Sequence, residues 1–134
     1  MLMPSIERYM TRQPWTIRRS ARCSAALQLM QEHRVRHLPV LEGGKVVGVV
    51  SERDLRLVPK IIGENPRDIS VEEVMSEDVY GATVDTAVDQ VLDHMSEHRY
   101  GACVVTDRQG GVAGIFTTVD ALERFSELLR RETA

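Results

Sequence analysis

The chain has 134 residues and a formal net charge of -3, with 43% hydrophobic and 28% charged residues. This composition is ordinary for a soluble globular unit and shows no disordered or low-complexity tract. The negative charge disfavours a nucleic-acid-binding protein, which needs a basic face that displaces counterions from phosphates.

The ends and the cysteines exclude further classes of protein. No basic patch followed by an apolar run stands at the N-terminus, and no segment approaches the roughly 18 apolar residues of a membrane span. We therefore expect a cytoplasmic protein that does not bind membranes. Cys23 and Cys103 lie far apart, so neither a disulfide scaffold nor a Cys-x-x-Cys site is expected. Both should pack as small hydrophobic side chains.

The sequence repeats itself after 65 residues. Residues 5–11 align with 70–76 and, with one residue inserted, 48–54 align with 114–120. A copy of this size would be only marginally stable alone, so the two copies should pack on each other.

Each copy begins with a short helical turn, after Ser5 in the first and Ser70 in the second, where Glu73 completes a capping box. Extended pieces are expected at 15–17 and 80–82. An amphipathic helix follows in each copy, with apolar residues at i, i+3, i+4 and i+7. These residues are Cys23, Ala26, Leu27 and Met30, then Val88, Val91, Leu92 and Met95.

Two strands joined by a tight turn come next, at 38–41 and 46–50, then at 103–106 and 112–116. Their Val, Ile and Leu runs predict strands covered on both faces. Pro39 cannot donate to a ladder, so its strand should lie near a sheet edge or end at this residue. A second helix begins at Ser51, short because Pro59 follows, and a longer one begins at Thr117.

The last helix has an apolar stripe that predicts either a core face or a dimer seam: Ala121, Leu122, Phe125, Leu128 and Leu129. The segment 60–68 has the composition of a linker. We therefore predict an α+β fold with repeat 1 at 1–60, a linker at 61–69 and repeat 2 at 70–134. Each repeat runs helix, strand, helix, strand, strand, helix, and two small sheets carry helices outside.

Both copies end in Gly-x-x-[Ser/Thr]-x-x-Asp, which gives Ser51 and Asp54, then Thr117 and Asp120. One interpretation is a helix capping box that needs no ligand. The alternative is a ligand site, because an open helix start attracts phosphate and an Asp one turn later can accept from two ribose hydroxyls.

Both halves resemble CBS repeats, named after cystathionine β-synthase, and together they resemble one tandem pair. The matching segments are 10–11, 32–40 and 48–54, then 75–76, 98–105 and 114–120. The resemblance implies pseudo-twofold symmetry and adenosine-containing ligands in clefts between the repeats. It also implies a homodimer.

The resemblance also implies the site residues. Asp54 and Asp120 would hold ribose hydroxyls, while Ser51 and Thr117 would contact ribose or phosphate. Adenine would lie among Thr16, Ile17, His37, Leu38 and Pro39 in one cleft, and among Gly81, Ala82, Ala102, Cys103 and Val104 in the other. Arg36, His37 and Arg53 lie near the expected phosphate side of the first cleft, whereas Gly101 replaces Arg36 in the second.

The expected function is a regulatory module that binds AMP, ADP or ATP, with NAD and S-adenosylmethionine as further candidates, and that signals to a protein partner. The alternative is a ligand-free structural or dimerisation module. We expect no enzyme activity, cofactor or metal. The motif His94-Met95-Ser96-Glu97-His98 resembles a zinc-peptidase signature, but its Glu and second His belong to the repeat. Cys103 and His37 lack an acid that would orient them as a nucleophilic pair.

Overall fold

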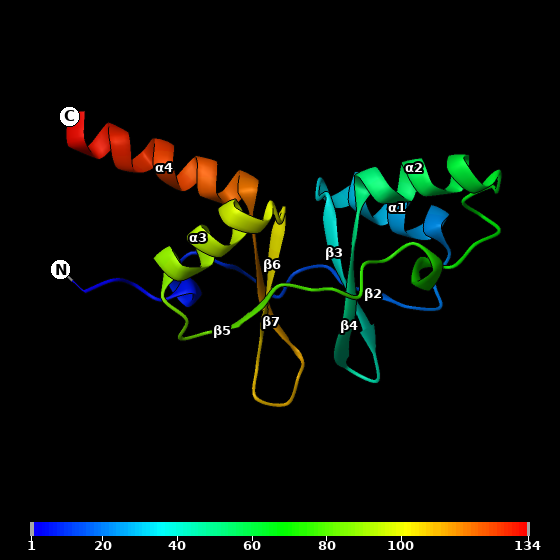
Figure 1. Ribbon diagram of the computed structural model, residues 1–134, viewed down its shortest axis with the longest axis horizontal. Helices are drawn as coiled ribbons and strands as arrows, with labels where there is room; N and C mark the ends of the chain where they lie inside the picture. Colours follow the sequence, from blue (N-terminus) through cyan, green and yellow to red (C-terminus); the bar gives the residue numbers. More distant parts are fainter. Residues whose placement is uncertain (1, 134) are drawn as a thin grey trace.

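The computed structural model describes residues 2–133 as two similar halves standing side by side (Figure 1). The first repeat of the sequence contains η1 (Ile6–Arg8), β1 (Thr11–Arg12), β2 (Ile17–Arg18), α1 (Cys23–His33), β3 (His37–Glu42), β4 (Lys45–Ser51) and α2 (Glu52–Ile62). In the second are η2 (Val71–Glu73), β5 (Gly81–Thr83), α3 (Val88–His98), β6 (Ala102–Thr106), β7 (Val112–Thr117) and α4 (Thr118–Thr133). The predicted α+β fold is confirmed.

The two sheets repeat one plan. In the first, β3 pairs parallel with β2 and antiparallel with β4; in the second, β6 pairs parallel with β5 and antiparallel with β7. The register shifts between Val40 and Leu41 in one hairpin and between Val105 and Thr106 in the other, at equivalent positions. The duplication therefore extends to the irregularities of the backbone.

Each half completes the hydrophobic core of the other. Ile6 and Met10, from the start of the chain, are buried in the core of the second half. Val71 and Val74, from the start of the second repeat, are buried in the core of the first. The backbone follows the same exchange, since β1 pairs with β7 and Ser76 pairs with Val49 of β4. The predicted boundaries of the two repeats, 1–60 and 70–134, and of the linker at 61–69 stay a prediction. Residues 1 and 134, at the outer ends of the repeats, lie outside the described residues.

Two equivalent glycines permit this exchange. A Cβ on Gly114 would lie 2.8 Å from the carbonyl oxygen of Thr11, and one on Gly48 would lie 2.9 Å from that of Ser76. Real Cβ atoms do not approach so closely, so both positions exclude any side chain. Because the repeated Gly has no Cβ, the backbone of the other repeat can approach it closely.

Two predictions about prolines are wrong. Pro39 lies in β3, the central strand of its sheet, where the β2 ladder begins only at Val40, one residue later. Pro59 does not end α2, which continues to Ile62 and is capped by Gly63 with φ of 75°. With 11 residues, α2 is still shorter than α4, which has 16, as predicted. Pro59 is buried, so packing against the core outweighs the lost helical hydrogen bond.

The apolar stripes differ from the prediction in the second half. The stripe of α1 is buried at Cys23, Ala26 and Met30, but Leu92 of α3 is 40% exposed. No described residue of α4 is buried, so its stripe is not a core face. In the described part of the chain, no helix is both long and apolar enough to span a membrane.

Replacement of Gly114 by Ala should lower the free energy of unfolding by about 1–3 kcal/mol, because the new methyl group collides with the backbone of β1. Urea unfolding measures the change. Gly81→Ala is the matched control, since its Cβ would meet nothing closer than the carbonyl oxygen of Val104 at 3.6 Å. Equal unfolding midpoints for the two variants would contradict this account of the exchange.

Candidate functional site

The first set of predicted site residues lies where strands meet the start of α2. His37, Leu38 and Pro39 are on β3, and His37 stands directly opposite Ser51, the last residue of β4. On the neighbouring strand β2, Ile17 pairs with Val40 of β3, and Thr16 immediately precedes Ile17. Arg53 and Asp54 occupy the first turn of α2. The fold therefore brings these residues to one corner of the first half.

The second set occupies the equivalent corner. Gly81 pairs with Val104 and Ala82 with Val105, so β5 lies beside β6. Ala102 stands opposite Thr117, as His37 stands opposite Ser51. The amide of Thr118 donates to the carbonyl of Gly101 at 3.1 Å, and the amide of Glu52 donates to that of Arg36 at 2.8 Å. These two bonds confirm that Gly101 takes the place of Arg36.

The two aspartates differ in what they bind. Asp120 closes a complete capping box, because its Oδ2 accepts from the amide of Thr117 at 2.9 Å and its amide donates to Thr117 Oγ1 at 3.3 Å. In the first half only one of these bonds forms, from the amide of Asp54 to Ser51 Oγ at 3.1 Å. Within residues 2–133 no hydrogen bond or ion pair engages the Asp54 carboxylate, which leaves its oxygens available.

His37 lies at the junction of the two halves. A Cβ on Gly101 of the second half would lie 3.0 Å from His37 Nε2, so the imidazole occupies the space in front of this glycine. The pKa of His37 is lowered from 6.5, mainly because burial disfavours the charged ring. The Asp54 carboxylate opposes this shift and Arg36 adds to it. His37 is thus a neutral hydrogen-bonding group near neutral pH.

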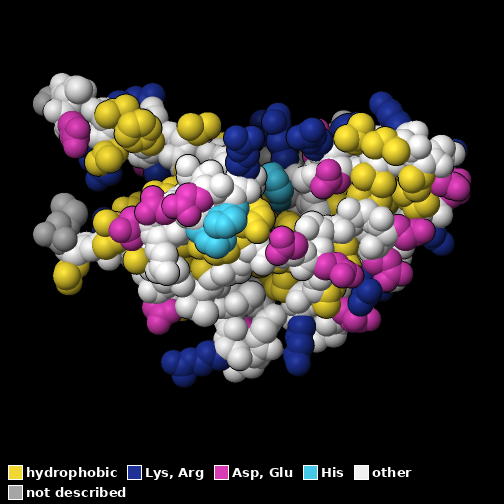
Figure 2. Space-filling model, viewed as in Figure 1, with side chains coloured by type: hydrophobic (Ala, Val, Ile, Leu, Met, Phe, Trp, Pro, Cys, Tyr) yellow, Lys and Arg dark blue, Asp and Glu magenta, His cyan; other side chains and the backbone are white. Residues whose placement is uncertain are grey.

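Basic side chains surround the first corner. Figure 2 shows Lys and Arg gathered along the upper edge of the junction between the halves. Arg36 and Arg53 are exposed, and in the described part of the chain no carboxylate lies within 4.0 Å of either guanidinium. Val119 stands in the second half at the position of Arg53. The first corner is therefore the more favourable one for an anion.

Several predicted site residues are core residues. Leu38 belongs to the core of the first half, and Ala82 and Cys103 to that of the second. Their side chains pack inward, so they can offer a ligand little beyond backbone groups. Burial raises the pKa of Cys103 to about 12, which keeps the thiol protonated and argues against a nucleophile. Both cysteines are free and buried, as predicted.

An aromatic side chain stacks on a histidine beside each corner, which sequence reasoning missed. Trp15, just before Thr16, stacks on His33 with ring centroids 3.6 Å apart. Tyr80, at the equivalent position, stacks on His94 at 4.0 Å. His94 in turn stacks on His98 at 4.2 Å. No group of three or more His, Cys, Asp or Glu among residues 2–133 could hold a metal ion.

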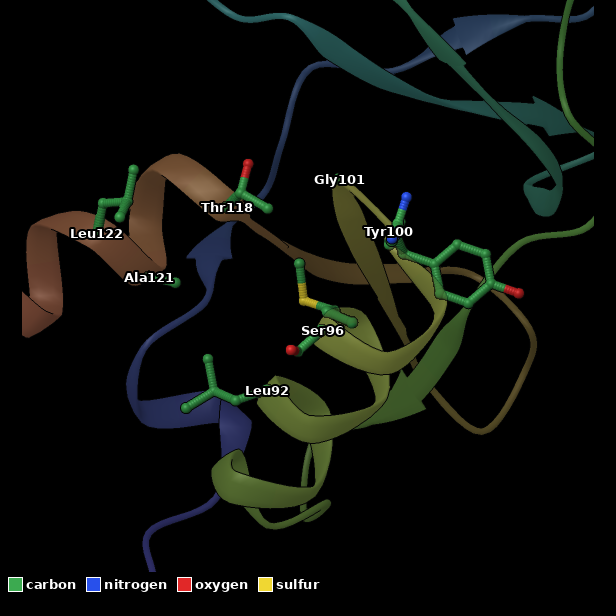
Figure 3. Close-up of a pocket in the computed structure, with 9 residues that line it drawn as sticks. Leu92, Ser96, Tyr100, Gly101, Thr118, Ala121 and Leu122 are labelled. Carbon is green, nitrogen blue, oxygen red and sulfur yellow. The ribbon is translucent and has the colours of Figure 1, made fainter.

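Two cavities lie between α3 and α4, and the smaller adjoins the second corner at Gly101. The smaller, about 410 Å³, has Leu92 and Ser96 of α3 on one side and Ala121 and Leu122 of α4 on the other (Figure 3). Of the predicted site residues only Gly101 lines it. The larger, about 920 Å³, extends along α4 to residues 3–9. The two apolar stripes facing each other were the available sequence signal for these cavities.

The CBS domain model matches residues 6–60 and 71–127. The chain belongs to the CBS domain family. This match supports the predicted tandem pair, since the two matched segments follow the two copies of the repeat.

Solved structures agree with this membership. The AcuB protein of Vibrio cholerae is 27% identical, with a TM-score of 0.90 and full coverage of both chains. The CBS domain pair of protein MJ0100, solved with 5′-methylthioadenosine and S-adenosyl-L-methionine, is 26% identical with a TM-score of 0.82. That match covers 94% of this chain and 98% of the MJ0100 pair.

Curated relatives match only in part of their own length. The L-aspartate semialdehyde sulfurtransferase of Methanocaldococcus jannaschii is 29% identical over 117 residues, which are 87% of this chain but 22% of the relative. The inosine-5′-monophosphate dehydrogenase of Thermoplasma acidophilum is also 29% identical, across 88% of this chain and 23% of the relative. The chain thus spans less than a quarter of the length of these enzymes, and the match does not transfer their activities.

The burial of His37 predicts a pH dependence of stability. As the pH falls below about 6.5, the unfolded chain takes up a proton at this residue before the folded protein does, so the folded state loses stability. His37→Gln should reduce the loss between about pH 7 and about pH 5. Urea unfolding at several pH values measures it, and parallel profiles for both proteins would contradict the burial of an uncharged imidazole.

Proposed function

We propose that the chain is a regulatory CBS pair that binds an adenosine-containing ligand at the corner formed by Ser51, Asp54 and His37. The Asp54 carboxylate supports the proposal most strongly, because it stands at a helix start without a hydrogen bond among the described residues. A carboxylate in this position can accept from both hydroxyls of a ribose. The binding of methylthioadenosine and S-adenosylmethionine by the MJ0100 pair, at 26% identity, is consistent with this ligand class.

The charges around this corner favour a phosphorylated ligand. Arg36 and Arg53 can contact phosphate oxygens, and the amides at the start of α2 add partial positive charge. ADP and ATP are therefore the preferred candidates, followed by AMP and NAD, with S-adenosylmethionine least favoured because of its positive charge. In the second half Asp120 already caps its own helix, so ribose must compete with the Thr117 amide there.

Signalling would follow from differential binding. A ligand held between the halves stabilises the arrangement in which both contact it, and a protein partner that recognises this arrangement gains affinity. This mechanism requires binding but no catalysis. A cytoplasmic location stays a prediction.

Asp54→Ala should weaken nucleotide binding by about 10- to 100-fold, because a charge-assisted hydrogen bond contributes roughly 1.5–3 kcal/mol. Isothermal titration with AMP, ADP, ATP, NAD and S-adenosylmethionine measures the affinity. Asp120→Ala is the matched control and should leave the tighter site intact. The absence of saturable heat with all five ligands would instead support a ligand-free structural or dimerisation module.

The proposal includes a homodimer through α2. Leu57, Ile61 and Ile62 are exposed on this helix, Ile61 to 71%, and Figure 2 shows hydrophobic side chains over the helices of this half. The neighbouring charges of Arg56 and Glu52 are paired with each other at 3.4 Å. A two-fold contact through this face would therefore bury the apolar surface of Leu57, Ile61 and Ile62.

Ile61→Ser should weaken self-association about tenfold or more, since burying a large apolar side chain contributes about 1.5–3 kcal/mol. Sedimentation equilibrium measures the dimer dissociation constant. Val119→Ser, which also replaces an exposed β-branched apolar side chain but on α4, is the control. A monomeric wild-type protein, or equal dimerisation of both variants, would contradict the assignment to α2.

A further inference from the structure

His37 is a titratable side chain at the junction of the two halves. It begins β3 opposite Ser51, the residue before α2, and the amide of Glu52 donates to the carbonyl of Arg36 at 2.8 Å. The ring extends from there to the second half, where a Cβ on Gly101 would lie 3.0 Å from its Nε2. The imidazole is therefore held between the start of α2 and the second half.

The ring nitrogens of His37 have no hydrogen-bond partner within residues 2–133. The histidine ring that forms a hydrogen bond in this part of the chain is that of His98, with the carbonyl of His94 at 3.1 Å. A neutral imidazole has one donor and one acceptor nitrogen, and a protonated one has two donors. A ligand that reaches the junction therefore meets a partly buried ring that can still change its protonation state.

Burial and two neighbouring charges set the protonation of this ring. Burial is the main reason that the pKa of His37 is lowered in the free protein. The carboxylate of Asp54, from the first turn of α2, opposes this effect, and the guanidinium of the preceding Arg36 adds to it. From the second half Gly101 packs against the ring and carries no charge. Added negative charge at the junction would therefore favour the protonated ring.

A phosphorylated ligand supplies such a charge. A phosphate oxygen paired with the Arg36 guanidinium offsets the positive charge that disfavours protonation of His37, and it adds negative charge of its own. The protonated ring can then donate a charge-assisted hydrogen bond, which is stronger than one from a neutral ring. Protonation of His37 and binding of the ligand therefore favour each other.

We propose that nucleotide binding at the first corner is coupled to the uptake of a proton by His37, so that affinity rises as the pH falls from about 7.5 to about 6. This inference rests on the proposed function, because it concerns the same corner, and it adds a regulation of that corner by pH. The residue equivalent to His37 in the second repeat is Ala102, which does not titrate. The coupling therefore belongs to the first corner.

Isothermal titration of the full chain with ADP tests the coupling, at about pH 7.5 and about pH 6 and in buffers of different ionisation enthalpy. Across this range the affinity of the wild type should rise at least about threefold more than that of His37→Gln, which corresponds to the uptake of about 0.3 proton per ADP. The terminal phosphate of ADP also titrates near about pH 6, but it does so equally for both proteins.

Two controls separate His37 from the other histidines and from effects of the substitution itself. His98→Gln removes an exposed histidine of α3 and should behave like the wild type. Nuclear magnetic resonance of the ring protons needs no variant. With saturating ADP, the midpoint of the His37 titration should move to higher pH, while that of His98 should stay unchanged.

The outcomes distinguish this inference from the proposed function. Saturable ADP binding with the same pH dependence in the wild type and in His37→Gln would overturn the coupling alone. An unchanged His37 midpoint in the presence of bound ADP would do the same, as would a loss of the pH dependence in His98→Gln. The absence of saturable heat with ADP would overturn the coupling together with nucleotide binding at the first corner.

Discussion

The structure depends on the exchange of one helical turn between the two halves. Ile6 and Met10 are buried in the second core, and Val71 and Val74 in the first, so neither half has a complete core of its own. A unit of about 65 residues is marginal even when its core is complete. The two halves should therefore fold and unfold together, and the backbone contacts at Gly48 and Gly114 hold them in one fixed arrangement.

This arrangement places two equivalent corners at one junction but does not make them alike. The imidazole of His37 lies against Gly101. The residue equivalent to His37 in the second repeat is Ala102, which has no ring. Asp120 is engaged by the Thr117 amide, while the Asp54 carboxylate remains available. A duplicated scaffold thus supplies the positions, and a few substitutions decide which corner can bind an anion.

Local patterns predicted the parts of the fold that depend on local chemistry. The capping box of Ser70 and Glu73 forms as expected, and both hairpins appear where the apolar runs predicted them. The exchange of helical turns could not be predicted, because apolar residues at Ile6 and Met10 do not specify which core receives them. The path of α2 through Pro59 depends on tertiary packing, which outweighs local propensity.

The candidate site was predictable to a similar degree. The repeated motif identified Ser51, Asp54, Thr117 and Asp120, but it applied equally to a capping box and a ligand site. Only the hydrogen bonds distinguish a capping box from a ligand site. The Asp120 carboxylate forms the capping bond, whereas only the amide of Asp54 is bonded and its carboxylate is not. The larger cavity between α3 and α4 was missed because a stripe on one helix does not reveal whether another element covers it.

The stack of Trp15 on His33 gives the molecule a spectroscopic asymmetry. Trp15 is the only tryptophan in the chain, and it immediately precedes Thr16 beside the first corner. Its counterpart in the second half is Tyr80, so the indole emission of the protein originates from one half alone. Events at the two corners can therefore be distinguished optically, without attaching a dye.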